Sequence, residues 1–218
     1  MLYITQKITI IKSNGTKVTF NPNKIISTCR RAGANKDATK RIIKKICGQI
    51  YRDVKTRDIY KMVLIALSEE KHGIALKQKY QLKDAIMRLG TEGFLFENYA
   101  SVILKNSGYK IAKIRSKTRG KCATHEIDLI VFSDDERILV ECKYHSKHGA
   151  YTGLKESLYT HARFLDTQPY FDSEYLICNT KVSTDAKKYA KCVGQKILSW
   201  RYPPKNSLEN IIEKNNLY

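Results

Sequence analysis

Two apolar runs near the middle of the chain, residues 125–132 and 137–143, are rich in Ile, Val and Leu and flank a short polar turn. Alternating apolar segments on either side of such a turn predict a β-hairpin. If residues 134–135 form the tip, Asp128 lies directly opposite Glu141. This register fixes which side chains share a face of the hairpin.

Helical and strand patterns alternate through the rest of the second half. We expect an extended segment at about 110–121, strands at about 174–179 and 196–200, and helices at about 92–106, 151–166, 184–193 and 207–214. This order is typical of an α/β domain with a mixed sheet flanked by helices.

The first half has a different pattern, which begins with a second hairpin signal. Asn14-Gly15 separates two short alternating segments, and four helical patterns follow at about 23–33, 37–51, 56–71 and 74–88. We therefore predict an α+β domain over residues 1–90, in which a hairpin caps a four-helix bundle. The α/β domain occupies residues 91–218, and no Ser-, Gly- or Pro-rich linker separates the two.

Basic residues dominate the composition, with a formal net charge of +19 and 42% hydrophobic residues. Residues 1–90 hold 20 Lys and Arg against 6 Asp and Glu, and residues 91–218 hold 20 against 15. The hydrophobic content argues against disorder. A polyanion is the expected partner, with nucleic acid favoured over an anionic membrane.

The cysteine pattern and the apolar segments limit where the protein works. None of the six cysteines forms a C-x-x-C pair, so we expect reduced thiols and no zinc site. No signal-peptide core and no run of 18 apolar residues is visible. We expect a soluble, cytoplasmic protein without a membrane partner.

Four charged residues share one face of the central hairpin: Glu126, Asp128, Glu141 and Lys143. Opposed carboxylates about 5 Å apart at Cβ suit a hard cation such as Mg²⁺ or Mn²⁺, which also removes their mutual repulsion. Lys143 could orient a water or offset charge on a phosphate. The alternative is a solvated strand face with mixed charges.

The extended segment before the hairpin carries basic residues at every second position. In a regular strand these side chains would lie on one face, where they could follow a phosphate backbone: Lys113, Arg115, Lys117, Arg119 and Lys121. The alternative is an edge strand that lysines protect from aggregation. Phosphate contact would give DNA binding with little sequence preference.

Four sequence blocks, in order, resemble the restriction-endonuclease-like PD-(D/E)xK nuclease superfamily, close to its Mrr-like branch. The blocks are Gly93 to Tyr99, Gly108-Tyr109, His125 to Asp128, and Val140 to Tyr144. Ile127 stands where the family signature has Pro, as in many members of the branch. No metal ligand is lost by this substitution.

The resemblance implies roles for individual residues. Asp128 and Glu141 would be metal ligands, with the Cys142 carbonyl as a further candidate ligand. Lys143 would be the catalytic lysine, and Glu97 the helix carboxylate that completes the active site.

The first half resembles the ATP-cone, a nucleotide-sensing module of ribonucleotide reductases. The matching residues are Ile11 to Gly15, Val18 to Phe20, Asn23 to Ile25, and the helix start at Thr56. The resemblance implies that Lys12 and Lys24 lie near the phosphates of ATP or dATP. Ser13 departs from the family, where a second basic residue is usual. The alternative is a basic helical module that has lost the nucleotide.

These features favour a Mg²⁺-dependent endodeoxyribonuclease that ATP or dATP regulates. The alternative is a nucleotide-responsive DNA-binding protein with an inactive nuclease fold. Clustered carboxylates facing DNA favour the enzyme, because they would hinder binding without a metal. A reductase regulator lacks support, since no zinc-ribbon cysteines are present. Palindromic cutting would suggest a homodimer, for which the sequence shows no signature.

Overall fold

The structure, a computed structural model, describes residues 8–90, 93–147 and 149–217. It divides into two compact units, Met1–Lys83 and Asp84–Tyr218. The predicted domain boundary at residues 90–91 stays a prediction, because it adjoins residues 91–92, which lie outside the described part. None of the helices in the described ranges has the length and apolar character needed to cross a membrane.

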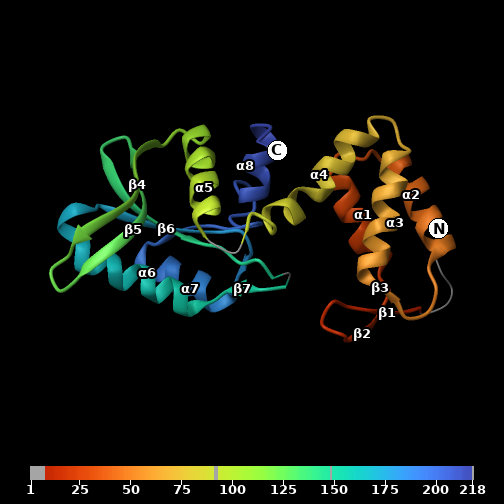
Figure 1. The fold of residues 1–218 in the computed structure, drawn as a ribbon, viewed down its shortest axis with the longest axis horizontal. Helices are drawn as coiled ribbons and strands as arrows, with labels where there is room; N and C mark the ends of the chain where they lie inside the picture. Colours follow the sequence, from red (N-terminus) through yellow and green to blue (C-terminus); the bar gives the residue numbers. More distant parts are fainter. Residues whose placement is uncertain (1–7, 91–92, 148, 218) are drawn as a thin grey trace. The chain divides into compact units, whose positions relative to one another are not determined.

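The N-terminal unit combines a small sheet with helices (Figure 1). Its elements are β1 (Thr9–Ile11), β2 (Lys17–Thr19), α1 (Pro22–Arg31), α2 (Lys36–Gln49), β3 (Val54–Lys55), α3 (Thr56–Ser68) and α4 (Gly73–Ile86). The Asn14-Gly15 hairpin is confirmed, with Ile10 opposite Val18. The strand β3, which pairs in parallel with β1, was not predicted.

Asparagine side chains begin the first two helices of this unit. Asn21 Oδ1 accepts the Asn23 N–H at 3.0 Å, and Asn35 Oδ1 accepts the Ala38 N–H at 2.8 Å. Such caps satisfy backbone donors that a helix leaves unpaired. The four helices lie close to their predicted ranges, but the predicted four-helix bundle is not confirmed.

An apolar core holds the N-terminal unit together. The helix α2 packs against α1 and α3, and the core residues include Ile42, Ile43, Ile46, Val63 and Leu67. The short strand β3 contributes Val54, which is fully buried. This burial explains why a two-residue strand without any alternating pattern is held in place.

The C-terminal unit is built on a five-stranded mixed sheet. Its elements are α5 (Phe94–Asn106), β4 (Lys110–Arg119), β5 (Thr124–Ser133), β6 (Glu136–Lys143), β7 (Tyr151–Thr152), α6 (Leu154–Thr167), the 3₁₀ turn η1 (Gln168–Tyr170), β8 (Ser173–Cys178), β9 (Lys181–Val182), α7 (Thr184–Val193), β10 (Lys196–Leu198) and α8 (Leu208–Lys214).

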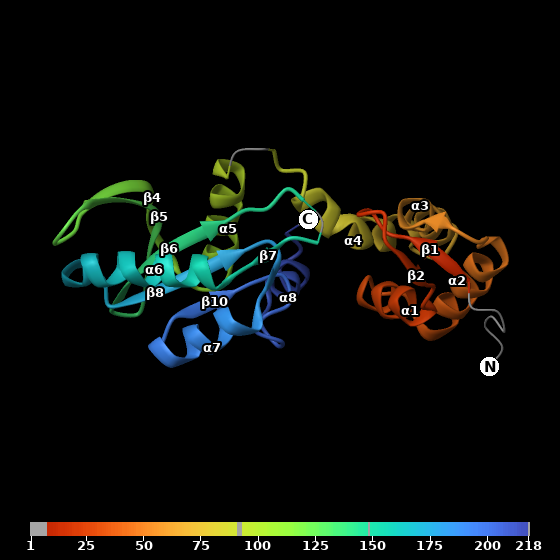
Figure 2. The same ribbon diagram turned by 90° about the horizontal axis from the view of Figure 1, so that it is seen from below.

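The strand order is β10-β8-β6-β5-β4, with β4 at an edge. The strands β4, β5 and β6 pair antiparallel, whereas β6, β8 and β10 pair in parallel. Helices α6 and α7 cover one face, and α5 and α8 cover the other (Figures 1 and 2). The predicted mixed sheet flanked by helices is confirmed.

The helix α6 packs on the sheet with a polar face. Ser157 and Thr160 are fully buried, whereas the apolar residues at helical spacing point outward, with Leu158 43% and Leu165 52% exposed. Ser157 donates to Gln195 Oε1, and Gln195 in turn donates to Glu174 Oε2 at 3.0 Å. These hydrogen bonds allow a polar face to be buried.

Asp166, near the end of α6, holds the turn between β4 and β5. Its Oδ1 accepts the Cys122 N–H at 2.6 Å, and its Oδ2 accepts the Ala123 N–H at 3.1 Å and lies 2.6 Å from His125 Nε2. The His125 hydrogen bond lowers the pKa of Asp166. Gly120 begins this turn, and a Cβ there would lie 2.3 Å from Asp166 Oδ2 and 2.9 Å from its carbonyl oxygen.

Substitution of Gly120 by Ala should therefore lower the free energy of unfolding by about 1–3 kcal/mol, the usual cost of an added methyl group without space. Urea denaturation followed by circular dichroism measures it. Gly48→Ala in α2 is the control, because a Cβ there meets no atom within 4 Å and alanine favours helix. Equal effects of the two substitutions would contradict the steric explanation.

Candidate active site

The hairpin of β5 and β6 has the predicted register. Leu129 pairs with Val140, and the ladder continues to Ser133 and Glu136. One residue beyond this ladder, Asp128 Oδ2 accepts the Cys142 N–H at 2.7 Å. Where the backbone ladder between β5 and β6 ends, the Asp128 side chain therefore provides the hydrogen bond between the two strands. At this point its carboxylate lies near Glu141.

Burial dominates the electrostatics of the two carboxylates. It raises the pKa of Asp128, and Glu97 raises it further, while the Cys142 N–H lowers it. Burial and the Asp128 carboxylate raise the pKa of Glu141, and the cations of Arg163 and Lys143 lower it. The two groups thus form a coupled acidic pair whose negative charge the fold only partly compensates.

Arg163 of α6 is a site residue that the sequence did not reveal. Its side chain is buried; Nη1 donates to Glu141 Oε2, and Nη2 donates to the Tyr159 hydroxyl at 2.9 Å. Its Cζ lies 4.7 Å from the centroid of the Tyr159 ring. The available signal was a row of polar residues at helical spacing, namely Ser157, Thr160, Arg163 and Thr167.

Glu97 of α5 is also buried, and an arginine holds it. Its Oε2 accepts from Arg115 Nε at 2.6 Å, and its Oε1 accepts from Arg115 Nη2 at 3.2 Å. The Arg115 Cζ lies 4.8 Å from the centroid of the ring of Phe94, the first residue of α5. Glu97 acts on Asp128 electrostatically, but its two oxygens are engaged by the guanidinium.

The donor set of this cluster fits a hard divalent cation. The carboxylates of Asp128 and Glu141 lie close enough to interact, and the chain between Glu141 and Lys143 adds the Cys142 carbonyl as a candidate donor. Oxygen donors of this kind suit Mg²⁺ or Mn²⁺. Across the residues that the structure describes, no three His, Cys, Asp or Glu side chains are arranged to hold a metal. Glu97 therefore does not complete the predicted set in this conformation. Lys143 is half-buried at the end of β6.

The predicted basic ribbon coincides only in part with a regular strand. Lys113, Lys117 and Arg119 are exposed on the edge strand β4. Between Ile111 and Lys113 the register shifts, and Arg115 has a φ of 50°. Lys121 lies beyond the strand, where its N–H donates to the Asp166 carbonyl at 2.8 Å. Regular alternation over all five residues is therefore wrong.

The two lysines predicted to contact a nucleotide lie on the surface of the N-terminal unit. Lys12 follows β1, where its N–H donates to the Thr16 carbonyl at 2.9 Å, and Lys24 lies in the first turn of α1. Both side chains are exposed. Their contact with a nucleotide phosphate stays a prediction.

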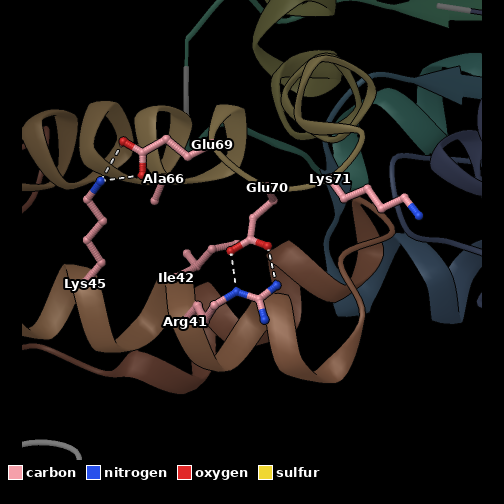
Figure 3. A pocket seen from close by; sticks show the side chains of 7 residues that line it. All are labelled: Arg41, Ile42, Lys45, Ala66, Glu69, Glu70 and Lys71. Carbon is pink, nitrogen blue, oxygen red and sulfur yellow. Dashed lines mark hydrogen bonds and ion pairs between the residues drawn. The ribbon is translucent and has the colours of Figure 1, made fainter.

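A separate hollow lies between α2 and the end of α3 (Figure 3). Arg41 forms an ion pair with Glu70 there, and Lys45 forms one with Glu69. Each of these cations is thus neutralised by a glutamate. The residues that line this hollow do not include Lys12 or Lys24, so it does not correspond to the predicted nucleotide site.

The half-buried acidic pair predicts a pH-dependent gain of stability for Asp128→Asn without divalent cations. Because the folded-state pKa of Asp128 is raised, the folded protein keeps its proton to higher pH than the unfolded chain, and stability falls as pH rises through that range. We expect a gain on the order of 1–3 kcal/mol at pH 8, since each unit of pKa shift is worth about 1.4 kcal/mol.

The gain should shrink toward pH 4.5, where the carboxyl group is protonated in the folded protein. Chemical denaturation in the presence of a chelator at both pH values provides the measurement. Asp135→Asn, at the exposed tip of the hairpin, is the matched control and should show no such change. A gain that is independent of pH would contradict the electrostatic explanation.

Known proteins share both units of this chain. Residues 8–81 match the ATP cone domain, and residues 89–200 match the restriction endonuclease family. An uncharacterized protein of Archaeoglobus fulgidus is 43% identical over 117 residues, which are 53% of this chain and 66% of that protein.

Two solved structures are similar to the chain. The crystal structure of AF1548, a protein of unknown function, has a TM-score of 0.56 and 39% identity and covers 58% of this chain and 68% of that one. The DNA modification-dependent restriction endonuclease AspBHI is 14% identical, with a TM-score of 0.42 over 64% of this chain and 36% of its own. From the match over residues 89–200, the chain belongs to the restriction endonuclease family, and an ATP cone domain precedes its nuclease domain.

Proposed function

We propose that the C-terminal unit is a metal-dependent endonuclease that hydrolyses phosphodiester bonds in DNA. The observation that carries this proposal is the half-buried pair of Asp128 and Glu141 at the end of the β5–β6 ladder, close to Lys143. A binding protein gains nothing from this arrangement, because two carboxylates repel the phosphate backbone. In a hydrolase, the same two carboxylates can bind a cation.

Asp128 and Glu141 would hold Mg²⁺ or Mn²⁺, with the Cys142 carbonyl as a third oxygen donor. A bound divalent cation supplies positive charge that polarises a phosphate and activates water. The hydrogen bond from the Cys142 N–H fixes one oxygen of Asp128 and leaves the other for a ligand.

The remaining residues of the site would orient the reactants. Lys143 would position the attacking water and offset the charge that develops on the phosphate. Arg163, held by Tyr159, fixes the carboxylate of Glu141. Lys113, Lys117 and Arg119 on the edge strand would contact the DNA backbone, which carries no sequence information.

The ATP cone domain supports a second part of the proposal, in which ATP or dATP controls the nuclease. Lys12 and Lys24 would contact the phosphates, because a lysine acts as a mobile point charge. Nucleotide binding would then change either DNA access or the formation of a homodimer. Size-exclusion chromatography with and without nucleotide separates these two routes.

One observation favours a second candidate, a nucleotide-responsive DNA-binding protein whose nuclease fold is inactive. Arginines engage two of the three acidic residues, Arg115 with Glu97 and Arg163 with Glu141. If these pairs never open, the carboxylates cannot hold a metal. DNA binding would then persist without cleavage.

Cleavage of supercoiled plasmid with Mg²⁺ or Mn²⁺ tests the enzyme. We expect nicking or linearisation by the wild type, and a loss of about 100-fold or more in Asp128→Ala and Lys143→Ala, as for other charge-stabilising groups. Asp135→Ala, at the hairpin tip, should cleave like the wild type. If DNA binding is intact but plasmid and branched DNA remain uncut, the binding protein becomes the better description.

Nucleotide binding by the N-terminal unit has its own test. We expect Lys12→Ala to weaken dATP binding about tenfold, because an ionic contact with a phosphate is lost. Isothermal titration calorimetry measures the affinity. Lys105→Ala, an exposed lysine on α5, removes the same charge from the nuclease unit and should leave dATP binding unchanged. Equal losses would show that only net charge matters.

A further inference from the structure

The ion pair between Glu97 and Arg115 joins two partners of unequal burial. The Glu97 side chain is 9% exposed, whereas the Arg115 side chain is 44% exposed. Arg115 lies on the edge strand, so solvent and a large ligand can reach it. The pair is therefore anchored by the buried carboxylate and open on the side of the guanidinium.

The backbone at Arg115 is also unusual. The neighbouring ladder pairs are Ile114 with Leu129 and Ser116 with Ile127, so Arg115 falls opposite Asp128. Its φ of 50° is in the left-handed region, which costs a non-glycine residue on the order of 1 kcal/mol. The strand β4 continues through this residue, but no ladder pair forms at Arg115, and its side chain hydrogen-bonds to Glu97.

Arg115 contributes positive charge to an acidic cluster. Its guanidinium hydrogen-bonds to Glu97 and also acts electrostatically on Glu126 and Asp128. Glu97 in turn lies close enough to Asp128 to affect it. Without a bound cation, Arg115 therefore acts as the counter-ion of the carboxylate that α5 presents.

We propose that Arg115 is an exchangeable counter-ion that keeps Glu97 away from the metal site until DNA binds. The Arg115 guanidinium then binds a DNA phosphate in place of Glu97. The released Glu97 joins Asp128 and Glu141 around the divalent cation. This inference rests on the proposed function, which it extends by coupling DNA contact to completion of the metal site.

The exchange is chemically balanced. A guanidinium binds phosphate with the same two-pronged geometry that it uses for a carboxylate. The released Glu97 gains a divalent cation in place of a monovalent one, so its buried charge does not remain uncompensated. The Arg163–Glu141 pair differs, because its arginine is only 9% exposed and is fixed by Tyr159.

The two residues of the exchange were both predicted as site residues, but for separate roles. Glu97 was expected at the metal site and Arg115 on the DNA backbone. In the structure they are paired, and in the described residues Glu97 is not part of a three-ligand cluster. The proposal reconciles these observations, since each residue takes its predicted role only after the pair opens.

Binding of Mn²⁺ to the full chain without DNA, measured by isothermal titration calorimetry, tests the proposal. We expect Arg115→Gln to bind Mn²⁺ about three- to tenfold more tightly than the wild type, because Glu97 is free. In a Glu97→Gln background the same substitution should give no gain. A gain that depends on Glu97 shows that Arg115→Gln acts by releasing Glu97 as a metal ligand. A gain without Glu97 would show that the lower positive charge alone is responsible.

Arg201→Gln is the matched control, since Arg201 is 43% exposed and pairs with Glu209 at 3.0 Å in the same unit. It should leave Mn²⁺ binding unchanged. Arg115→Lys, which keeps the charge but loses the two-pronged contact, should give an intermediate gain and guards against misfolding of the glutamine variant. Thermal unfolding verifies that each variant is folded.

The possible results are distinct. If Arg115→Gln and Arg115→Lys are folded and bind Mn²⁺ no more tightly than the wild type, the exchange is overturned and Arg115 only joins β4 to α5. A gain that persists in the Glu97→Gln background also overturns it. If Asp128→Ala alone does not weaken Mn²⁺ binding relative to the wild type, the proposed metal site itself is contradicted.

Discussion

The repulsion between the half-buried carboxylates of Asp128 and Glu141 shapes the polar structure of the nuclease unit. Burial and mutual repulsion raise the pKa of Glu141, and such a pair is costly unless cations or donors compensate it. The Cys142 N–H donates to Asp128 and Arg163 donates to Glu141, while Glu97 and Arg115, which form an ion pair, both act electrostatically on Asp128. Each of these contacts comes from a different part of the fold, so the sheet, α5 and α6 are joined through one charged cluster.

The same cluster explains why α6 is built contrary to the usual rule for a surface helix. Its buried face must deliver Arg163 to Glu141, and the neighbouring Ser157 and Thr160 continue the polar character of that face. Hydrogen bonds satisfy these groups, so the cost of burying them is small. The leucines at helical spacing are consequently left on the outer side.

The two units divide the chemistry between them. The N-terminal unit has most of the excess positive charge, including the exposed Lys12 and Lys24, whereas the C-terminal unit contains the half-buried acidic pair. Positive charge attracts a polyanion from a distance, while the carboxylates require a cation before a phosphate can approach. The proposed regulation by a nucleotide and the proposed cleavage of DNA would thus depend on charges of opposite sign in the two units.

Features that depend on neighbouring residues follow from the amino-acid sequence. Both hairpins, the register that places Leu129 opposite Val140, and the approximate bounds of the helices follow from turn residues, periodicity and caps. Short residue blocks are also enough to reveal the resemblance to both families. Local chemistry determines these features, since the side-chain period and the turn geometry act over a few residues.

The groups that meet across the sheet are brought together by the fold and by no local pattern. Arg115 is 18 residues from Glu97, and Arg163 is 22 residues from Glu141, and no periodicity links such positions. The sequence also did not predict the outward leucines of α6 or the two-residue strand β3. In both cases the neighbouring elements determine which side chains are buried, and the pattern of the segment itself does not. The amino-acid sequence thus specifies the elements and the acidic pair through local chemistry, whereas the counter-ions of that pair depend on long-range packing.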